Sequence, residues 1–288
     1  MKKSTTLIFI ATTAAFFCLS LFSCKKSDET GKEEFSPEKT RKKLEKRLKE
    51  LNKAIEKNPE DAAALNERGS LYLGQARYQE AVNDLTRAIE TNTEMAEIFI
   101  NRGIAFKNLK QFDRAVLDFT QAVEIDNSNA EPHYHLGDIY FLNKLWPEAI
   151  DSYNKALAIN PTYTAAYANR GVAFKNSGRL DEALADYTKA LELDPTMALT
   201  FNNRGNIYFN KGLFKEALSD FDKAIELNPS LAMAYSGRGF THERLGELEK
   251  AISDLEKFLE VAPDSFAQYK TMAEKKIAEL QKKLEKSP

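Results

Sequence analysis

A strict period of 34 residues dominates this chain and limits what it can fold into. Six glycines recur at this spacing without a slip, and six alanines follow them at a constant offset. They are Gly69, Gly103, Gly137, Gly171, Gly205 and Gly239, then Ala81, Ala115, Ala149, Ala183, Ala217 and Ala251. A fixed period of this length is typical of an array of supersecondary units, each of which packs only on its neighbours. Six such units fill residues 62–265 without an insertion.

Each unit has the pattern of two helices joined by a turn. Counting from the first residue of each unit, position 4 (usually apolar or aromatic), the glycine at 8 and the residue at 11 fall on one helical stripe. The alanine at 20, a large apolar residue at 24 and a mostly small residue at 27 form a second stripe. Glycine costs about 1 kcal/mol relative to alanine inside a helix, so its recurrence indicates a close crossing of two helices.

This pattern resembles the tetratricopeptide repeat (TPR), whose marks fall at positions 8, 11, 20, 24, 27 and 32. The resemblance implies an all-α protein, a right-handed superhelical solenoid of helix-turn-helix TPR hairpins with N- and C-terminal capping helices. The expected segments are 1–24 (signal peptide with lipobox, or anchor), 25–37 (polar tether), 38–61 (N-terminal capping helix), the repeats 62–95, 96–129, 130–163, 164–197, 198–231 and 232–265, and 266–288 (C-terminal capping helix).

The start of the chain differs from the repeats. Residues 4–24 carry no charge and follow Lys2 and Lys3, as in an export signal. Leu21 to Cys24 resembles a bacterial lipobox, with Phe22 where a small residue is usual. An uncleaved membrane anchor and an ordinary cleaved signal are the alternatives. The sequence favours lipidation of Cys24, because a lone cysteine at the end of an apolar run has a role only in a lipoprotein. The expected location is a bacterial cell envelope, with the repeats outside the cytoplasm.

The two cysteines, Cys18 and Cys24, both lie in this first segment. The repeats therefore offer no disulfide and no thiolate metal site. His133 and His135 are two residues apart, so on a helix they point to different faces. No catalytic arrangement stands out from the repeat pattern. We expect no metal, no cofactor and no enzymatic activity.

Charge is unevenly distributed along the chain. The whole sequence has a net charge of −2, but the six repeats alone carry −9. Since neutralisation of phosphates drives binding to nucleic acids, an acidic array of this kind excludes that class of partner.

An arginine at position 7 and an aspartate at position 23 occur together. Both are present in five units, whereas the third unit has Leu136 and Ser152 instead. The pairs are Arg68 with Asp84, Arg102 with Asp118, Arg170 with Asp186, Arg204 with Asp220, and Arg238 with Asp254. In an antiparallel hairpin these positions come close together. We predict a charge-assisted bond that clamps the two helices of each unit.

Asparagine is concentrated at positions 2, 6, 9 and 13 of the first helix, which we call the groove stripe. It lies about 200° round from the hairpin core and, in the family, lines the concave groove. The predicted groove residues are Asn101, Asn108, His135, Asp138, Asn169, Asn176, Asn203, Asn206, Asn210 and Arg244. Asparagine is a weak helix former, and its amide both donates and accepts hydrogen bonds, as recognition of a peptide backbone requires. Similar repeats that clamp the C-terminal carboxylate of heat-shock chaperones need clustered Lys and Arg, and Arg244 with Lys107 and Lys175 at the neighbouring position 12 is too little for that function.

The sequence therefore predicts a lipid-anchored scaffold or adaptor that binds an extended segment of a partner protein. Two alternatives remain open. One is a carbohydrate- or peptidoglycan-associated subunit of an envelope enzyme complex, with His135 and Asp138 facing a glycan. The other is a structural spacer without a ligand. Similar architectures in other envelope proteins do not identify the partner.

Overall fold

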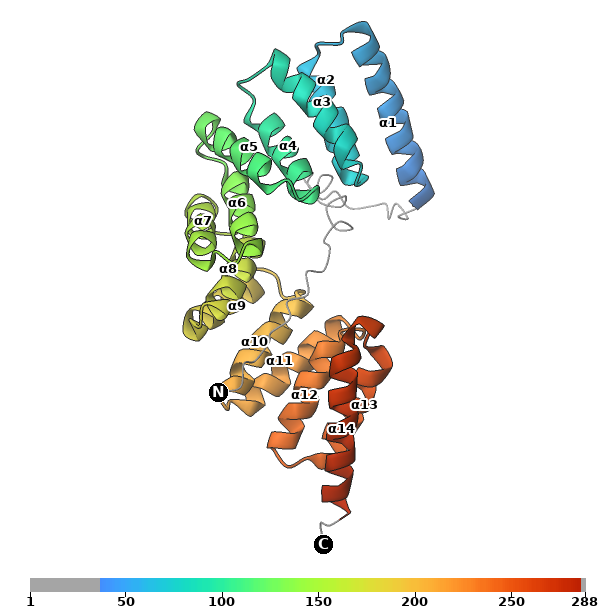
Figure 1. Cartoon of the computed structure of the whole chain (residues 1–288), viewed down its shortest axis with the longest axis vertical. Helices are drawn as coiled ribbons and strands as arrows, with labels where there is room; N and C mark the ends of the chain where they lie inside the picture. The colour runs from blue at the N-terminus through green and yellow to red at the C-terminus, as the bar shows by residue number, and fades with distance from the viewer. Residues whose placement is uncertain (1–36, 286–288) are drawn as a thin grey trace, which may run out of the picture. The chain divides into compact units, whose positions relative to one another are not determined.

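The computed structural model describes residues 37–285, and every regular element in that range is a helix. The elements are α1 (Pro37–Lys57), α2 (Ala62–Gly74), α3 (Tyr78–Thr91), α4 (Ala96–Asn108), α5 (Phe112–Ile125), α6 (Ala130–Leu142), α7 (Trp146–Ile159), α8 (Thr164–Asn176), α9 (Leu180–Leu193), α10 (Ala198–Asn210), α11 (Phe214–Leu227), α12 (Ala232–Arg244), α13 (Leu248–Val261), η3 (Asp264–Phe266) and α14 (Ala267–Leu284). Each predicted repeat corresponds to two of these helices, which confirms the all-α class and the consecutive hairpins (Figure 1). Cys24 and the apolar segment before it lie outside the described residues.

The described residues divide into two compact units, 37–135 and 136–285, and the boundary falls inside α6. In the first unit, α1 packs on α2. Helices α2 and α3 form one hairpin, α4 and α5 form the next, and α3 contacts α4. In the second unit, α8, α10 and α12 form hairpins with α9, α11 and α13. Each of these hairpins packs on the next, and α14 covers α13.

The recurring glycine and alanine mark the closest packing inside each hairpin. All six alanines at position 20 are fully buried. A Cβ atom placed on Gly103 would lie 2.7 Å from Cε1 of Phe119, and one on Gly137 would lie 2.6 Å from Cε1 of Tyr153. The residue at position 24 therefore packs directly against the backbone of the glycine. This contact is the physical reason for the glycine that the sequence pattern indicated.

Two local backbone features form the turns between helices. The residue at position 15 has a positive φ in every repeat, whether it is glycine or not. These residues are Ala76, Lys110, Lys144, Gly178, Gly212 and Gly246. At the end of most repeats, an Asn or Asp at position 31 accepts a bond from the backbone N–H two residues later, as Asp194 does from Thr196. Such Asx turns end the second helix and direct the chain into the next repeat.

The terminal helices complete the array as incomplete repeats. On α1, Leu51 and Ile55 are buried while most of the other side chains are exposed, so this helix acts as the second helix of a missing repeat. On α14, Ala273 takes the place of the repeat glycine and is buried with Ile277 and Leu280. Within residues 37–285 no helix combines the length and the apolar character that crossing a bilayer requires.

Candidate functional site

The arginines and aspartates of five repeats meet in two parallel hydrogen bonds. In each pair, Nε and Nη2 of the arginine donate to the two carboxylate oxygens over 2.6–2.9 Å. The aspartates are buried, and the guanidinium groups lie over aromatic rings of their own helix, as Arg204 does over Phe201 and Tyr208. Fixed, charge-assisted bonds of this kind are among the stronger polar contacts in proteins. The bond with Asp220, partly offset by burial, raises the pKa of Arg204.

Each clamp arginine also reaches back to the preceding repeat, which the sequence pattern did not reveal. Its Nη1 donates to the residue sixteen positions earlier, on the second helix of that repeat. The acceptors are Asn52, Thr86, Asn154, Thr188 and Asp222. The arginine therefore connects two repeats as well as two helices of one repeat. A polar residue recurring at position 25 was the available signal in the sequence.

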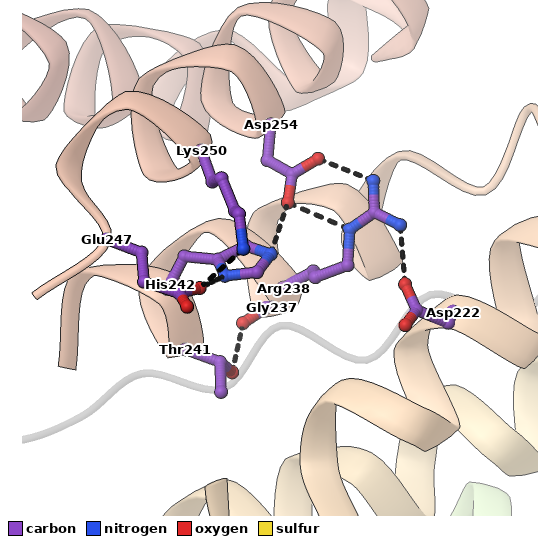
Figure 2. A network of polar contacts seen from close by, with 8 residues as sticks. All are labelled: Asp222, Gly237, Arg238, Thr241, His242, Glu247, Lys250 and Asp254. Atoms are coloured by element: carbon purple, nitrogen blue, oxygen red, sulfur yellow. Dashed lines mark hydrogen bonds and ion pairs between the residues drawn. The ribbon is translucent and has the colours of Figure 1, made fainter. Parts of the chain in front are cut away.

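Figure 2 shows the last clamp and the polar contacts around it. Arg238 lies between Asp254 and Asp222, with 2.6 Å from Nη2 to Asp254 and from Nη1 to Asp222. His242 stands beside the clamp, its Nδ1 2.5 Å from Oε2 of Glu247 and its Nε2 3.7 Å from Oδ2 of Asp254. Hydrogen bonding by His242 and Lys250 lowers the pKa of Glu247. This cluster holds α12 and α13 together.

In the first unit, the groove stripe is largely engaged by the protein itself. The amide of Asn101 donates to the side chain of Asn66 over 2.9 Å, and Asn108 donates to a backbone carbonyl of its own helix. His135 is only 4% exposed, so it lies in the interior instead of on an open groove wall. Its Nδ1 is 2.9 Å from Nζ of Lys107, and its ring packs against Phe119.

Glu131 completes this interior cluster, with Oε1 3.5 Å from Nε2 of His135. Burial acts to raise the pKa of Glu131, but the bond with His135 and the nearby charge of Lys107 outweigh it and hold the pKa below its usual value. The expectation that His135 faces a ligand is therefore corrected. The helical pattern identifies the side of a hairpin that faces away from its own core, but it does not show that the preceding repeat covers that side, as Lys107 and Phe119 cover His135.

In the second unit, the stripe divides into engaged and available side chains. Asp138 accepts bonds through Oδ1 from the hydroxyl of Tyr153 at 2.9 Å and from the amide of Asn169 at 3.0 Å. Asn206 donates to the backbone carbonyl of Asn202. Three of the predicted groove residues therefore make hydrogen bonds that stabilise the array: Asp138, Asn169 and Asn206.

The remaining stripe residues of the second unit have different surroundings. Within the described residues, the amide nitrogen of Asn176 is buried with no hydrogen-bond partner, and Asn203 and Asn210 make no side-chain hydrogen bond. Arg244 is exposed and lies over the ring of Phe214. Leu199 and Met233, at position 2, are 55% and 37% exposed. Polar amides and exposed apolar side chains therefore share this face.

The described residues contain no group of three or more His, Cys, Asp or Glu side chains placed to hold a metal ion.

Comparisons with known proteins place the chain among repeat proteins. Tetratricopeptide repeat models match residues 164–197, 198–231, 50–83 and 233–265, and a TPR repeat model matches 106–144 and 137–178. A search of curated proteins finds no significant match.

Several solved structures are similar. YrrB, described as a TPR protein with an unusual peptide-binding site, is 29% identical, with a TM-score of 0.55 over 62% of this chain and 93% of that one. MamA is 25% identical, with a TM-score of 0.52 over 56% and 94%. Pseudomonas aeruginosa pilF, at 17% identity, shares the fold with a TM-score of 0.66 over 74% and 97%. The family-model matches together cover more than half of the chain, and the helices of the chain pair as the repeat requires. The chain therefore belongs to the tetratricopeptide repeat family.

Proposed function

We propose that this chain is a lipid-anchored adaptor that binds an extended segment of a partner protein along the groove stripe of its second unit. Repeats of this family are generally non-enzymatic, and the fold supports the coarser function of a protein–protein interaction scaffold. One observation carries the finer proposal. Among residues 37–285, the amides of Asn203 and Asn210 make no side-chain hydrogen bond, and the same face exposes Leu199 and Met233.

The chemistry of this face fits an extended peptide. A primary amide can donate to a peptide carbonyl and accept from a peptide N–H at the same time, so it recognises backbone without selecting a side chain. The exposed apolar groups at position 2 can pack on side chains of the ligand. The similarity to YrrB, whose description includes a peptide-binding site, supports the same class of ligand here.

The glycan-binding alternative depended on His135 and Asp138. His135 is buried against Lys107 and Glu131, while Asp138 accepts bonds from Tyr153 and Asn169. His135 is therefore an interior residue and the carboxylate of Asp138 is already engaged within the protein, so no observation favours a glycan over a protein partner.

Photo-crosslinking in the cells that make the protein tests the groove. A benzoylphenylalanine at Leu199 or Met233 is expected to capture one protein, because both side chains are exposed on the stripe. Lys189 and Lys223, partly exposed on the second helices α9 and α11, are the control sites and are expected to capture none. Mass spectrometry of the products identifies the partner. Equal capture from both faces, or capture from the control sites alone, would contradict binding in the groove.

The anchor is tested separately at Cys24. The wild-type chain is expected to incorporate an alkyne analogue of palmitate and to partition into detergent, because the lipobox-like Leu21–Cys24 stretch ends the apolar run. Cys24→Ala is expected to lose the label, whereas Cys18→Ala keeps it. Labelling that persists in Cys24→Ala would show that the cysteine is not the lipidation site.

A further inference from the structure

Helix α1, at the edge of the first unit in Figure 1, carries a row of lysines on its outer face. They recur every three or four residues, so they share one side of the helix, and all of them are exposed. We call this row the lysine stripe: Lys39, Lys42, Lys46, Lys49, Lys53 and Lys57. At 100° per residue, it lies about 180° from the buried side chains of Leu51 and Ile55, on the side of α1 that packs on α2. The packing of α1 therefore leaves the stripe open to solvent.

The acidic residues of α1 leave most of the stripe unpaired. Glu45 and Glu50 pair with arginines, and Glu38 pairs with Lys42. Within residues 37–285, the side chains of four stripe lysines make no ion pair and no hydrogen bond: Lys46, Lys49, Lys53 and Lys57. With nine Lys and Arg residues against four Glu, α1 has a net charge of +5. Much of this positive charge lies on the face opposite the buried side of the helix.

Exposed lysines in the repeats have different surroundings. Lys189, Lys223 and Lys257 each pair with the glutamate three residues later, over 3.1, 2.8 and 2.8 Å. Such pairs support a solvated helix, whereas like charges one turn apart repel each other and destabilise it. The lysine stripe therefore costs helix stability in the free protein, and an anionic partner offsets that cost.

The shape and the position of the stripe favour a membrane surface over a small anion or a nucleic acid. Its two ends, Lys39 and Lys57, are about 27 Å apart along the helix axis, so only an extended surface meets all six lysines at once. Residues 25–36 join Cys24 to α1 and span at most about 45 Å, which keeps headgroups within reach of the stripe if Cys24 carries a lipid. A nucleic acid has no such tether, and the repeats, with a net charge of −9, repel its phosphates.

We propose that the lysine stripe lies on anionic lipid headgroups of the membrane that holds the anchor, an inference that rests on the anchoring part of the proposed function. Anionic leaflets attract basic segments close to a membrane attachment, and each lysine near the surface adds to the attraction. The anchor raises the local concentration of headgroups around α1, so the two attachments reinforce each other. Because α2 packs on the opposite side of α1, the acidic repeats of the first unit lie farther from the headgroups than the stripe does.

Lysine acetylation followed by mass spectrometry tests this contact in the full-length chain. The chain is reconstituted into vesicles of phosphatidylcholine, or of an equal mixture of phosphatidylcholine and phosphatidylglycerol, and is treated with an N-hydroxysuccinimide ester of acetate. The anionic vesicles are expected to slow the acetylation of Lys49 and Lys57 about threefold or more relative to the neutral ones, and high salt should abolish the difference. Lys189 and Lys223, on the second helices α9 and α11, are the controls and should react equally in both.

Several results would overturn the proposal. Equal acetylation of the stripe in both kinds of vesicle is one of them. Slowing of Lys189 and Lys223 to the same extent is another, because the whole chain would then adsorb without using α1 in particular. Protection of the stripe in envelope membranes of the producing cells, but not in anionic vesicles, would mean that a protein covers it. Protection by a duplex oligonucleotide added to neutral vesicles, stronger than that by anionic lipid, would identify a nucleic-acid site instead.

Two matched double variants assign the effect to the stripe. Lys46→Gln with Lys53→Gln removes two of its charges, and glutamine has nearly the same helix propensity as lysine. In anionic vesicles this change is expected to reduce the ratio of docked to undocked α1 about tenfold or more, so that the remaining stripe lysines react nearly as fast as in neutral vesicles. Lys189→Gln with Lys223→Gln removes the same charge from the repeats and should leave the protection unchanged. The midpoint of thermal unfolding should not fall in the stripe variant, since Lys46 and Lys53 make no ion pair within residues 37–285.

The outcome is separate from those of the anchor and groove tests. Flotation of the chain with neutral vesicles reports the anchor alone. A chain that floats with neutral vesicles but shows no protection in anionic ones would overturn the role of the stripe and leave the anchor standing. A chain that is protected in anionic vesicles but does not float with neutral ones would support the stripe and contradict the anchor. Photo-crosslinking through Leu199 or Met233 reports the groove, whatever the stripe binds.

Discussion

Replacement of Arg204 by leucine is expected to lower the free energy of unfolding by about 3–5 kcal/mol, the usual effect of breaking one side of a buried ion pair. Asp220 is 4% exposed and would lose both of the bonds that Arg204 donates, at 2.8 Å each. The hydroxyl of Thr188 in the preceding repeat would lose a donor as well. Urea denaturation followed by circular dichroism measures the effect.

The third repeat suggests how this loss can be reversed. It has Leu136 and Ser152 at the clamp positions, and Ser152 is buried without a charge. Arg204→Leu combined with Asp220→Ser copies that arrangement and is expected to recover most of the lost stability, since no uncompensated charge remains. If the losses of the two single variants simply add in the double variant, the two side chains do not act as a pair.

A surface pair in the same unit provides the matched control. Lys223 and Glu226 lie 2.8 Å apart on α11, but both are substantially exposed. Lys223→Leu is expected to change the free energy of unfolding by less than about 1 kcal/mol, because water screens exposed ion pairs. A loss as large as that of Arg204→Leu would mean that burial does not determine the effect.

Gly103→Ala is expected to destabilise the chain by about 1–3 kcal/mol, although alanine favours a helix over glycine by about 1 kcal/mol. The added methyl group would lie 2.7 Å from Cε1 of Phe119, a ring that is 0% exposed and has no room to move away. Thermal unfolding of the two proteins measures the difference.

Gly205 offers a graded comparison for this prediction. Its Cβ position is 3.0 Å from the nearest atom of Phe221, so the clash in Gly205→Ala is milder. We expect a smaller loss there, and helix propensity can offset part of it. An increase in stability for Gly103→Ala would show that the glycine is not required by the close helix crossing.

Much of the fold and of the scaffold chemistry could be predicted from the sequence, because these features repeat within each unit. Glycine at position 8 and a large residue at position 24 predicted the crossing of Gly103 on Phe119. The joint absence of arginine and aspartate from the third repeat predicted which side chains would meet, as Arg204 and Asp220 do. In both cases the two partners lie in one hairpin, whose geometry follows from helical periodicity alone.

Contacts between repeats could be settled only by the tertiary structure. Periodicity placed Asn169 and Asn203 at the same position, yet Asn169 is bonded to Asp138 while Asn203 has no such partner. It also placed His135 on the groove stripe, where packing of Phe119 and Lys107 makes it an interior residue. The sequence by itself determined the repeat, the helices and the clamps inside each hairpin. The tertiary structure decided which polar side chains have hydrogen-bond partners and which remain available. Hydrogen bonding at position 6 depends on the residues that two neighbouring repeats bring together, and those residues vary from one repeat to the next.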